Sequence, residues 1–206
     1  MRIFVDTQWM WAAPIIALVV GYALGSIPFG VILTRLAGAG DLRQIGSGNI
    51  GATNVLRTGR KGLAAATLLL DLAKGWAAVA IVAALFPGEE ILAATGAFLG
   101  HCYPVWLQFK GGKGVATLMG IALALGWPIG LVYAVVWLGL LALVRISSVA
   151  GMAAAMSAPV VAAAMGRFDV SALLLAMALI VLWKHRANIE RLVAGTEPRI
   201  GAKKQG

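Results

Sequence analysis

Seven apolar runs, separated by polar or Gly/Pro breaks, do most to constrain what this chain can fold into. A helix of about 20 residues is needed to cross the roughly 30 Å hydrocarbon core of a bilayer, and several of the runs approach or exceed that length. The sequence therefore predicts membrane-spanning helices rather than a soluble core. The expected helices cover Trp9–Arg35, Leu63–Phe86, Ile91–Leu107, Val115–Gly126, Pro128–Val144, Val149–Met165 and Val170–Trp183.

The composition supports the same fold class. Apolar residues make up 61% of the 206 residues and charged residues 12%, whereas soluble domains are about half apolar and about a quarter charged. We therefore expect an all-α integral membrane protein in which residues 1–206 form a single polytopic membrane domain. The single cysteine, Cys102, excludes an intramolecular disulfide. The N-terminus lacks a small-residue cleavage site after a short apolar region, which favours a retained first span over a signal peptide.

Basic residues set the expected orientation, because cytoplasmic loops carry an excess of Lys and Arg. With seven spans and the N-terminus outside, fourteen of the seventeen basic residues fall on one side, and only Arg2, Arg167 and the intramembrane Lys74 do not. Fusing the fourth and fifth runs, the main alternative, would place Arg145 outside and reverse the basic tail. The count favours seven spans with a cytoplasmic C-terminus. The expected cytoplasmic segments are 36–62, 109–114, 145–148 and the tail 184–206, and their basic residues are Arg35, Arg43, Arg57, Arg60, Lys61, Lys110, Lys113, Arg145, Lys184, Arg186, Arg191, Arg199, Lys203 and Lys204.

A glycine-rich polar segment, Asp41–Arg60, lies between the first two apolar runs. Glycine lets a backbone approach a ligand closely, and successive N–H groups in such loops bind anions. Arginine side chains add bidentate contacts to phosphate. A solvated, capped loop or a disordered one is the alternative, but structureless loops this long are uncommon in compact proteins. A polar cup could form from Asp41, Arg43, Ser47, Asn49, Thr53, Asn54 and Arg57, in which Arg43 and Arg57 would clamp a phosphate.

A second segment of this kind, Phe109–Gly114 (FKGGKG), directly precedes an expected helix. Loop N–H groups followed by a helix N-terminus hold anions well. The segment resembles a phosphate loop but is not a Walker A motif, because GxxxxGK[ST] is absent. A basic cytoplasmic turn is the alternative. The candidate phosphate-binding residues are Lys110, Gly111, Gly112, Lys113 and Gly114.

Two ionisable residues, Asp71 and Lys74, lie three apart within an expected span. Intramembrane charges are costly and usually face protein or water, so we expect a buried ion pair that fixes helix packing. His101, beside Cys102 in another apolar run, is expected to be a structural histidine.

Near the C-terminus, KHRANIERL places His185 and Asn188 on one face if the last span continues as a helix. A histidine beside an amide can orient and deprotonate a hydroxyl, although a basic helix terminus is the alternative. Arg145, Ser147 and Ser148 are a further possible anion contact, or simple packing groups between spans.

These blocks together resemble the bacterial acyl-phosphate:glycerol-3-phosphate acyltransferases, the PlsY family, from about Gly25 to Gly201. The resemblance rests on GSIPFG (25–30), DLRQIGSGNIGATNVLR (41–57), DLAKG (71–75), GHCYPVW with FKGGKGVAT (100–117), and KHRANIERLVAGTE (184–197). Agreement of several blocks in the same order is hard to obtain by chance. The glycine-rich first block and the FKGGKGVAT block are the most specific.

The resemblance implies a seven-helix enzyme of the bacterial inner membrane with a cytoplasmic active site. Such enzymes transfer a fatty acyl group from acyl phosphate to the sn-1 hydroxyl of glycerol 3-phosphate, which gives lysophosphatidic acid and phosphate in the first acylation of phospholipid synthesis. The FKGGKG loop would bind phosphate, and the first block would supply an essential Ser47 and Arg43 or Arg57. The last block would supply Asn188 and a structural Glu197, with His185 joining the catalytic group.

No cofactor or metal is expected, because no His/Asp/Glu set has ligand spacing, and no nucleic-acid partner is expected. The partners would be the two substrates and the bilayer, with the protein acting as a monomer. The main rival is a small anion transporter with a cytoplasmic phosphate-binding site, although its charges would lie near the midplane and its polar groups on both faces. A non-catalytic lipid-binding scaffold would not need two glycine-basic loops. Soluble-domain acyltransferases use a His-x4-Asp pair, which this sequence lacks.

Overall fold

The computed structural model describes residues 7–201, with side chains from Trp11 onward. Arg2, Lys203 and Lys204, which enter the charge count above, lie outside this range. Within it, every regular element is helical. The elements are α1 (Thr7–Gly25), α2 (Phe29–Leu36), the 3-10 helix η1 (Leu42–Gln44), α3 (Ala52–Leu56), α4 (Lys61–Leu85), α5 (Glu90–Cys102), the 3-10 helix η2 (Val105–Leu107), α6 (Val115–Leu125), α7 (Trp127–Val144), α8 (Ser147–Ala164), α9 (Phe168–Lys184) and α10 (Arg186–Val193).

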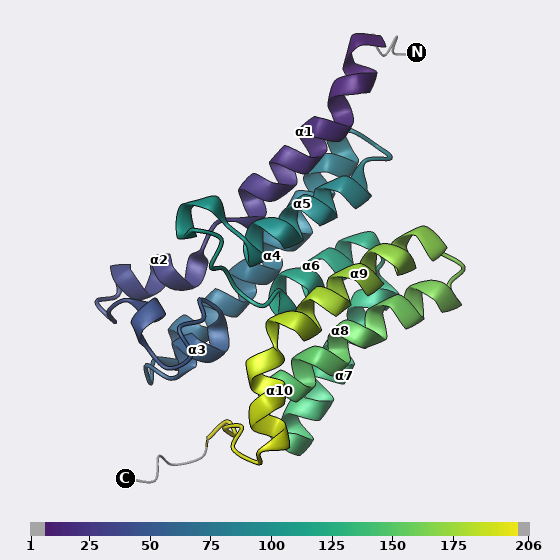
Figure 1. The fold of residues 1–206 in the computed structure, drawn as a ribbon. Coiled ribbons are helices and arrows are strands. Elements are labelled where there is room, and N and C mark those ends of the chain that lie inside the picture. The colour runs from purple at the N-terminus through teal and green to yellow at the C-terminus, as the bar shows by residue number, and fades with distance from the viewer. Residues whose placement is uncertain (1–6, 202–206) are drawn as a thin grey trace. The chain divides into compact units, whose positions relative to one another are not determined.

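The chain divides into two compact units, Met1–Ala124 and Leu125–Gly206. In the first unit, α1 lies along α5 and α4 contacts both, as Figure 1 shows. Glycines four apart on each partner, Gly21 and Gly25 on α1 and Gly96 and Gly100 on α5, sit against the backbone of the other helix, where a Cβ would collide. Small residues at this spacing are typical of close packing between membrane helices.

In the second unit, α8 packs against both α7 and α9. Its buried face is made of small residues, among them Ala150, Ala154 and Ala158, which allow close approach. The α8–α9 pair is also joined by a hydrogen bond of 2.8 Å from Ser171 Oγ to the carbonyl of Pro159.

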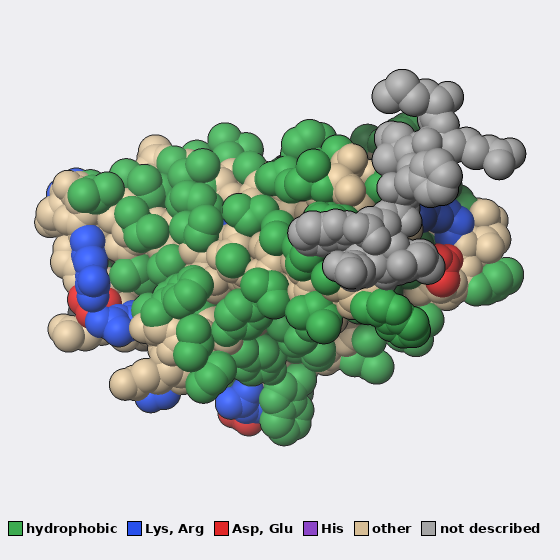
Figure 2. Space-filling view, turned by 90° about the horizontal axis from the view of Figure 1, so that it is seen from above, with side chains coloured by type: hydrophobic (Ala, Val, Ile, Leu, Met, Phe, Trp, Pro, Cys, Tyr) green, Lys and Arg blue, Asp and Glu red, His purple; other side chains and the backbone are tan. Residues whose placement is uncertain are grey.

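Four helical stretches are long and apolar enough to cross a membrane: Trp11–Leu36, Lys61–Leu85, Trp127–Val144 and Ser147–Ala164. A fifth results if α9 and α10, which meet at 58°, count as one span. Hydrophobic side chains cover much of the face seen in Figure 2. Several large hydrophobic side chains of the chain, among them Trp11 and Leu143, are strongly exposed. Such a surface suits lipid rather than water.

The first expected helix is broken. Residues Ser26–Pro28 separate α1 from α2, because proline has no N–H and disfavours helix in the residue before it. The exposed carbonyls are satisfied from elsewhere in the unit: Trp106 Nε1 donates to Ser26 O and Lys74 Nζ to Ile27 O, both at 2.8 Å. Polar backbone at membrane depth requires such partners.

Other boundaries also differ from the expected ranges. Helix α5 ends at Cys102, ahead of Pro104, and the short turn η2 replaces the rest of the expected run. The polar segment between the first two spans contains a helix, α3, that the sequence did not predict. Helices α6 and α7 are separate elements on either side of Gly126, whose backbone is extended.

Candidate active site

The glycine–lysine loop, residues 109–114, folds back onto the C-terminal end of α5. The N–H of Gly111 donates to Cys102 O at 3.2 Å, and that of Gly112 donates to His101 O at 3.0 Å. Gly114 has a φ of +89° and lies against the ring of Phe98, so both its conformation and its surroundings require glycine. The next residue begins α6. The loop is therefore held in place immediately before a helix N-terminus.

Behind this loop lies a row of buried polar side chains. Asp71 Oδ1 and Lys74 Nζ form an ion pair of 2.7 Å on α4, and each side chain is below 5% exposed. His101 Nδ1 lies 3.8 Å from the same Asp71 oxygen. Lys74 also donates to Ile27 O at the α1–α2 break and lies 5.8 Å from the centroid of the Phe29 ring. The row joins α4, α5 and the break.

Asn54 organises the segment Asp41–Arg60. Its side chain is buried, and Nδ2 donates to three backbone carbonyls, Leu42 at 3.0 Å and Ile45 and Asn49 at 2.8 Å. Its Oδ1 accepts the backbone N–H of Ser47 at 3.2 Å. The side-chain amide of Asn54 therefore holds the loop together. Asn54, which was expected to bind an anion, uses its side chain to bind the backbone of its own loop.

The tip of this loop is exposed. Gly46 and Gly48 have φ values of +55° and +68°, and Ser47 between them is exposed, with its Oγ donating to Asn54 Oδ1 at 3.5 Å. Arg57 passes over Gly46 so closely that a Cβ there would fall 2.8 Å from Arg57 Nη1. The exposed Thr53 is near the start of α3. Paired positive-φ glycines around a serine, next to an arginine, form the kind of concavity that binds anions.

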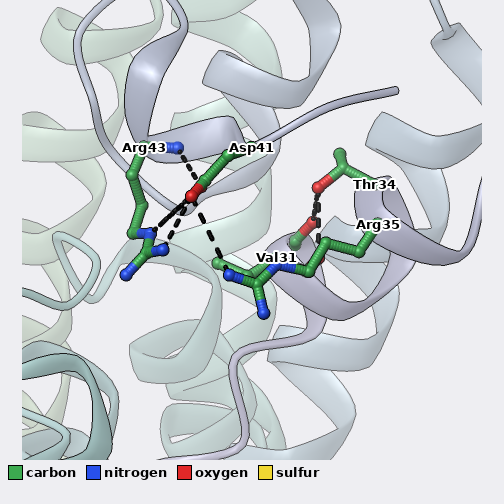
Figure 3. Close-up of polar contacts among 6 residues, drawn as sticks. Val31, Thr34, Arg35, Asp41 and Arg43 are labelled. Carbon is green, nitrogen blue, oxygen red and sulfur yellow. Dashed lines mark hydrogen bonds and ion pairs between the residues drawn. The ribbon is translucent and has the colours of Figure 1, made fainter. Parts of the chain in front are cut away.

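Arg43 has a different partner. Its Nη2 lies 2.6 Å from Asp41 Oδ2, and its Nε donates to Asp41 Oδ1 at 3.0 Å, so the fork is bidentate (Figure 3). Arg35 approaches the same carboxylate at 3.8 Å. The side-chain hydrogen bonds from Arg43, and then its backbone N–H, lower the pKa of Asp41 from 3.8 to about 2. The clamp expected for a phosphate closes on a carboxylate in this structure.

In the second unit, His185 occupies the bend between α9 and α10. The helix does not continue through it, contrary to the condition under which His185 and Asn188 were expected to share a face. The ring is buried, and its Nδ1 lies 2.8 Å from Val181 O. A carbonyl can only accept, so Nδ1 carries a proton.

The carboxylate of Glu197 accepts hydrogen bonds from three side chains of this unit. Its Oε1 accepts from Ser148 Oγ at 2.7 Å and from Asn188 Nδ2 at 2.5 Å, and its Oε2 accepts from Arg191 Nε at 2.7 Å. Burial acts to raise the pKa of Glu197, but these hydrogen bonds and the charge of Arg191 outweigh it and hold the pKa below the ordinary 4.5. The tail is fastened once more where the Ile200 N–H donates to Arg145 O.

The first unit thus gathers the residues of the two glycine-basic segments and the buried ion pair, and the second gathers Ser148, Asn188 and Glu197. Ser147 begins α8 and is partly exposed, and Lys110 is exposed. Sequence reasoning missed Arg191 and the backbone role of Ile27. The first had a weak signal, a basic residue six positions before Glu197, and the second had none. No three His, Cys, Asp or Glu side chains gather as a metal site anywhere in residues 7–201.

Fold and site define the class of the protein: a helical, multi-pass membrane protein with two glycine-rich basic loops. A family model described as glycerol-3-phosphate acyltransferase matches residues 15–195. The chain belongs to the glycerol-3-phosphate acyltransferase family.

Curated relatives carry the same description. The protein from Novosphingobium aromaticivorans is 70% identical over 190 residues, which cover 92% of this chain and 96% of the relative. The protein from Erythrobacter litoralis is 60% identical, again over 92% of this chain and 96% of the relative. Among solved structures, PlsY (YgiH), an integral membrane glycerol 3-phosphate acyltransferase in its glycerol 3-phosphate form, matches with a TM-score of 0.86 and 36% identity. The match covers 91% of this chain and 96% of that one.

Proposed function

We propose that this enzyme transfers a fatty acyl group from acyl phosphate to the sn-1 hydroxyl of glycerol 3-phosphate. The observation that carries the proposal is the glycine–lysine loop, whose glycines lie against α5 and lead into α6. Family membership and the glycerol 3-phosphate and lysophosphatidic acid forms of the related PlsY structure support the acceptor and the product.

Acyl phosphate is the donor that suits this residue inventory. It is a mixed anhydride whose phosphate leaves readily, so the site needs little general-acid help. Its main tasks are to hold two anionic groups and to align a hydroxyl with a carbonyl, and positioning can lower a barrier by roughly 7–11 kcal/mol. The exposed tip around Ser47, with Asn49, Thr53 and Arg57, and the loop around Lys113, with Lys110, would each bind a phosphate.

The transfer proceeds without an acyl-enzyme. The sn-1 oxygen attacks the acyl carbonyl carbon, the bond between that carbon and the phosphate oxygen breaks, and phosphate leaves with the electron pair. His185 Nε2 takes the hydroxyl proton, since Nδ1 already carries one. Asn188, whose side chain donates to Glu197, orients a substrate oxygen. Asn54 and Ser148 act through the backbone and through Glu197, respectively.

The membrane arrangement belongs to the same proposal. Residues 1–206 work as one polytopic domain, since the family model runs without interruption across both compact units. The charge distribution favours seven spans, an outer N-terminus and a cytoplasmic C-terminus, in the bacterial inner membrane. In this arrangement α5 and α6 count as spans although they have only 13 and 11 residues. A monomer is the active form.

The test uses the full chain purified in detergent. Palmitoyl phosphate and glycerol 3-phosphate are supplied together and singly, and phosphate and lysophosphatidic acid are both quantified. Palmitoyl-CoA replaces palmitoyl phosphate in a parallel reaction. Product that requires both substrates, and is lost in Lys113→Ala, supports the donor and the loop. Turnover with palmitoyl-CoA alone would contradict the donor assignment.

A further inference from the structure

The contact between Gly112 and His101 is not explained by packing of the helices alone. A Cβ built on Gly112 would collide with Nε2 of the imidazole and would lie 2.6 Å from Cε1. The Gly112 N–H is simultaneously bound to the carbonyl of His101. The glycine–lysine loop therefore contacts His101 through both the backbone and the ring of that residue.

The imidazole ring of His101 lies beside a buried ion pair. Nδ1 of His101 faces Asp71, and Asp71 is paired with Lys74, which is anchored to Ile27 O. The side chains of His101, Asp71 and Lys74 are each at most 5% exposed. Buried ionisable side chains are costly and usually face other protein groups. The ring of His101 therefore lies in a buried, charged setting that α4 supplies.

We propose that His101 is a positioning residue: its imidazole, which lies beside the buried Asp71–Lys74 pair, limits how closely the glycine–lysine loop approaches α5 and so places the loop N–H groups relative to the substrate phosphate. The inference rests on the proposed function. His101 touches no reacting atom. Its effect is on the position of the loop that binds the phosphate group. A misplacement of about 1 Å in such a group can lower the rate by up to roughly 100-fold.

A volume-exchange cycle tests the contact itself. Gly112→Ala drives a methyl group into the ring and should raise the KM for glycerol 3-phosphate or for palmitoyl phosphate by at least roughly tenfold, with a smaller change in kcat. His101→Ala removes the platform and should raise the same KM. In the double variant the new methyl group occupies the vacated space, so its KM should be lower than that of Gly112→Ala alone.

Val82→Ala is the matched control, because Val82 is buried on the same helix as Asp71 but in an apolar cluster with Ala17 and Ala93. It should lower the unfolding temperature and leave both KM values unchanged. If His101→Ala fails to fold, His101→Ser, which also vacates the space under Gly112 and keeps a polar group, takes its place in the cycle.

Two failures are distinguishable. Wild-type protein that does not turn over palmitoyl phosphate contradicts the proposed function, and the cycle is then read from the dissociation constant for glycerol 3-phosphate. Active wild type, with additive KM effects in the double variant or with KM unchanged in His101→Ala, overturns the positioning role alone. A KM in the double variant that is lower than the two single effects predict supports the positioning role, provided that Val82→Ala leaves KM unchanged.

Discussion

Asn188 Nδ2 donates to Glu197 Oε1 over 2.5 Å and so joins α10 to the C-terminal segment nine residues on. The same oxygen accepts from Ser148 at the start of α8. One carboxylate therefore fixes the amide that we assign to the reaction, and the tail beyond α10 becomes part of the candidate site. Glu197 therefore positions other residues of the candidate site and has no role in the reaction itself.

Glu197→Ala should lower the stability of the folded protein by about 1–3 kcal/mol, since it leaves buried donors on Ser148 and Asn188 without their acceptor. Glu197→Gln keeps one acceptor oxygen and should cost less. Unfolding temperature in detergent measures both. Glu190→Ala, at an exposed position of α10, is the control. Equal unfolding temperatures for Glu197→Ala and Glu190→Ala would contradict the clamp.

Acid should open this clamp. Because the folded state holds the pKa of Glu197 below 4.5, the unfolded chain takes up the proton first as the pH falls. The contribution of Glu197 to stability is therefore complete above the unfolded pKa and is lost as the pH drops through the folded one. We expect the unfolding temperature of the wild type to fall below about pH 4.5 more steeply than that of Glu197→Gln. Parallel curves for the two proteins would exclude this carboxylate as the cause.

His185→Asn separates orientation from proton transfer. The asparagine amide can replace Nδ1–H as donor to Val181 O but offers nothing at the position of Nε2. Loss of a general base typically costs about 10²–10⁴ in rate, and kcat should fall by that order while the unfolding temperature stays close to that of the wild type. Single-turnover measurement of lysophosphatidic acid formation reports the chemical step. An unchanged chemical step would remove His185 as the base.

Asn54→Asp should disable the loop although it changes only one atom type. A carboxylate cannot donate to the carbonyls of Leu42, Ile45 and Asn49, and it places negative charge against all three. We expect faster hydrogen exchange across residues 41–57 and loss of turnover, with α4 and α5 still protected. Gln44→Ala, exposed in the same segment, should preserve both exchange and turnover. Slow exchange in Asn54→Asp would show that the loop does not depend on this amide.

Gly96→Ala tests the close packing of α1 and α5. Its methyl group would enter the backbone of Leu18 and Tyr22, and overpacking of this kind typically costs about 1–3 kcal/mol. Gly62→Ala is the matched helical glycine, with nothing within 4 Å of the added Cβ, and should leave stability equal or slightly raised. Thermal unfolding of both compares them. A tolerated Gly96→Ala would mean that the two helices can separate at little cost.

The sequence by itself determined the class of the protein. Apolar run length and low charge require a helical membrane protein, because the need to cross the bilayer is met locally, segment by segment. Residue chemistry likewise identified the two glycine-basic segments and the histidine near the last span. The family resemblance was confirmed by the family model and by the curated relatives.

Only the tertiary structure decided which groups meet. It placed Lys74 on the carbonyl of Ile27, 47 residues away in sequence, and Gly112 on the ring of His101. It gave Arg43 a carboxylate as its partner and turned Asn54 inward to hold its own loop. Local sequence could not reveal these outcomes, since each depends on how closely two helices approach and on which backbone groups their packing leaves unsatisfied.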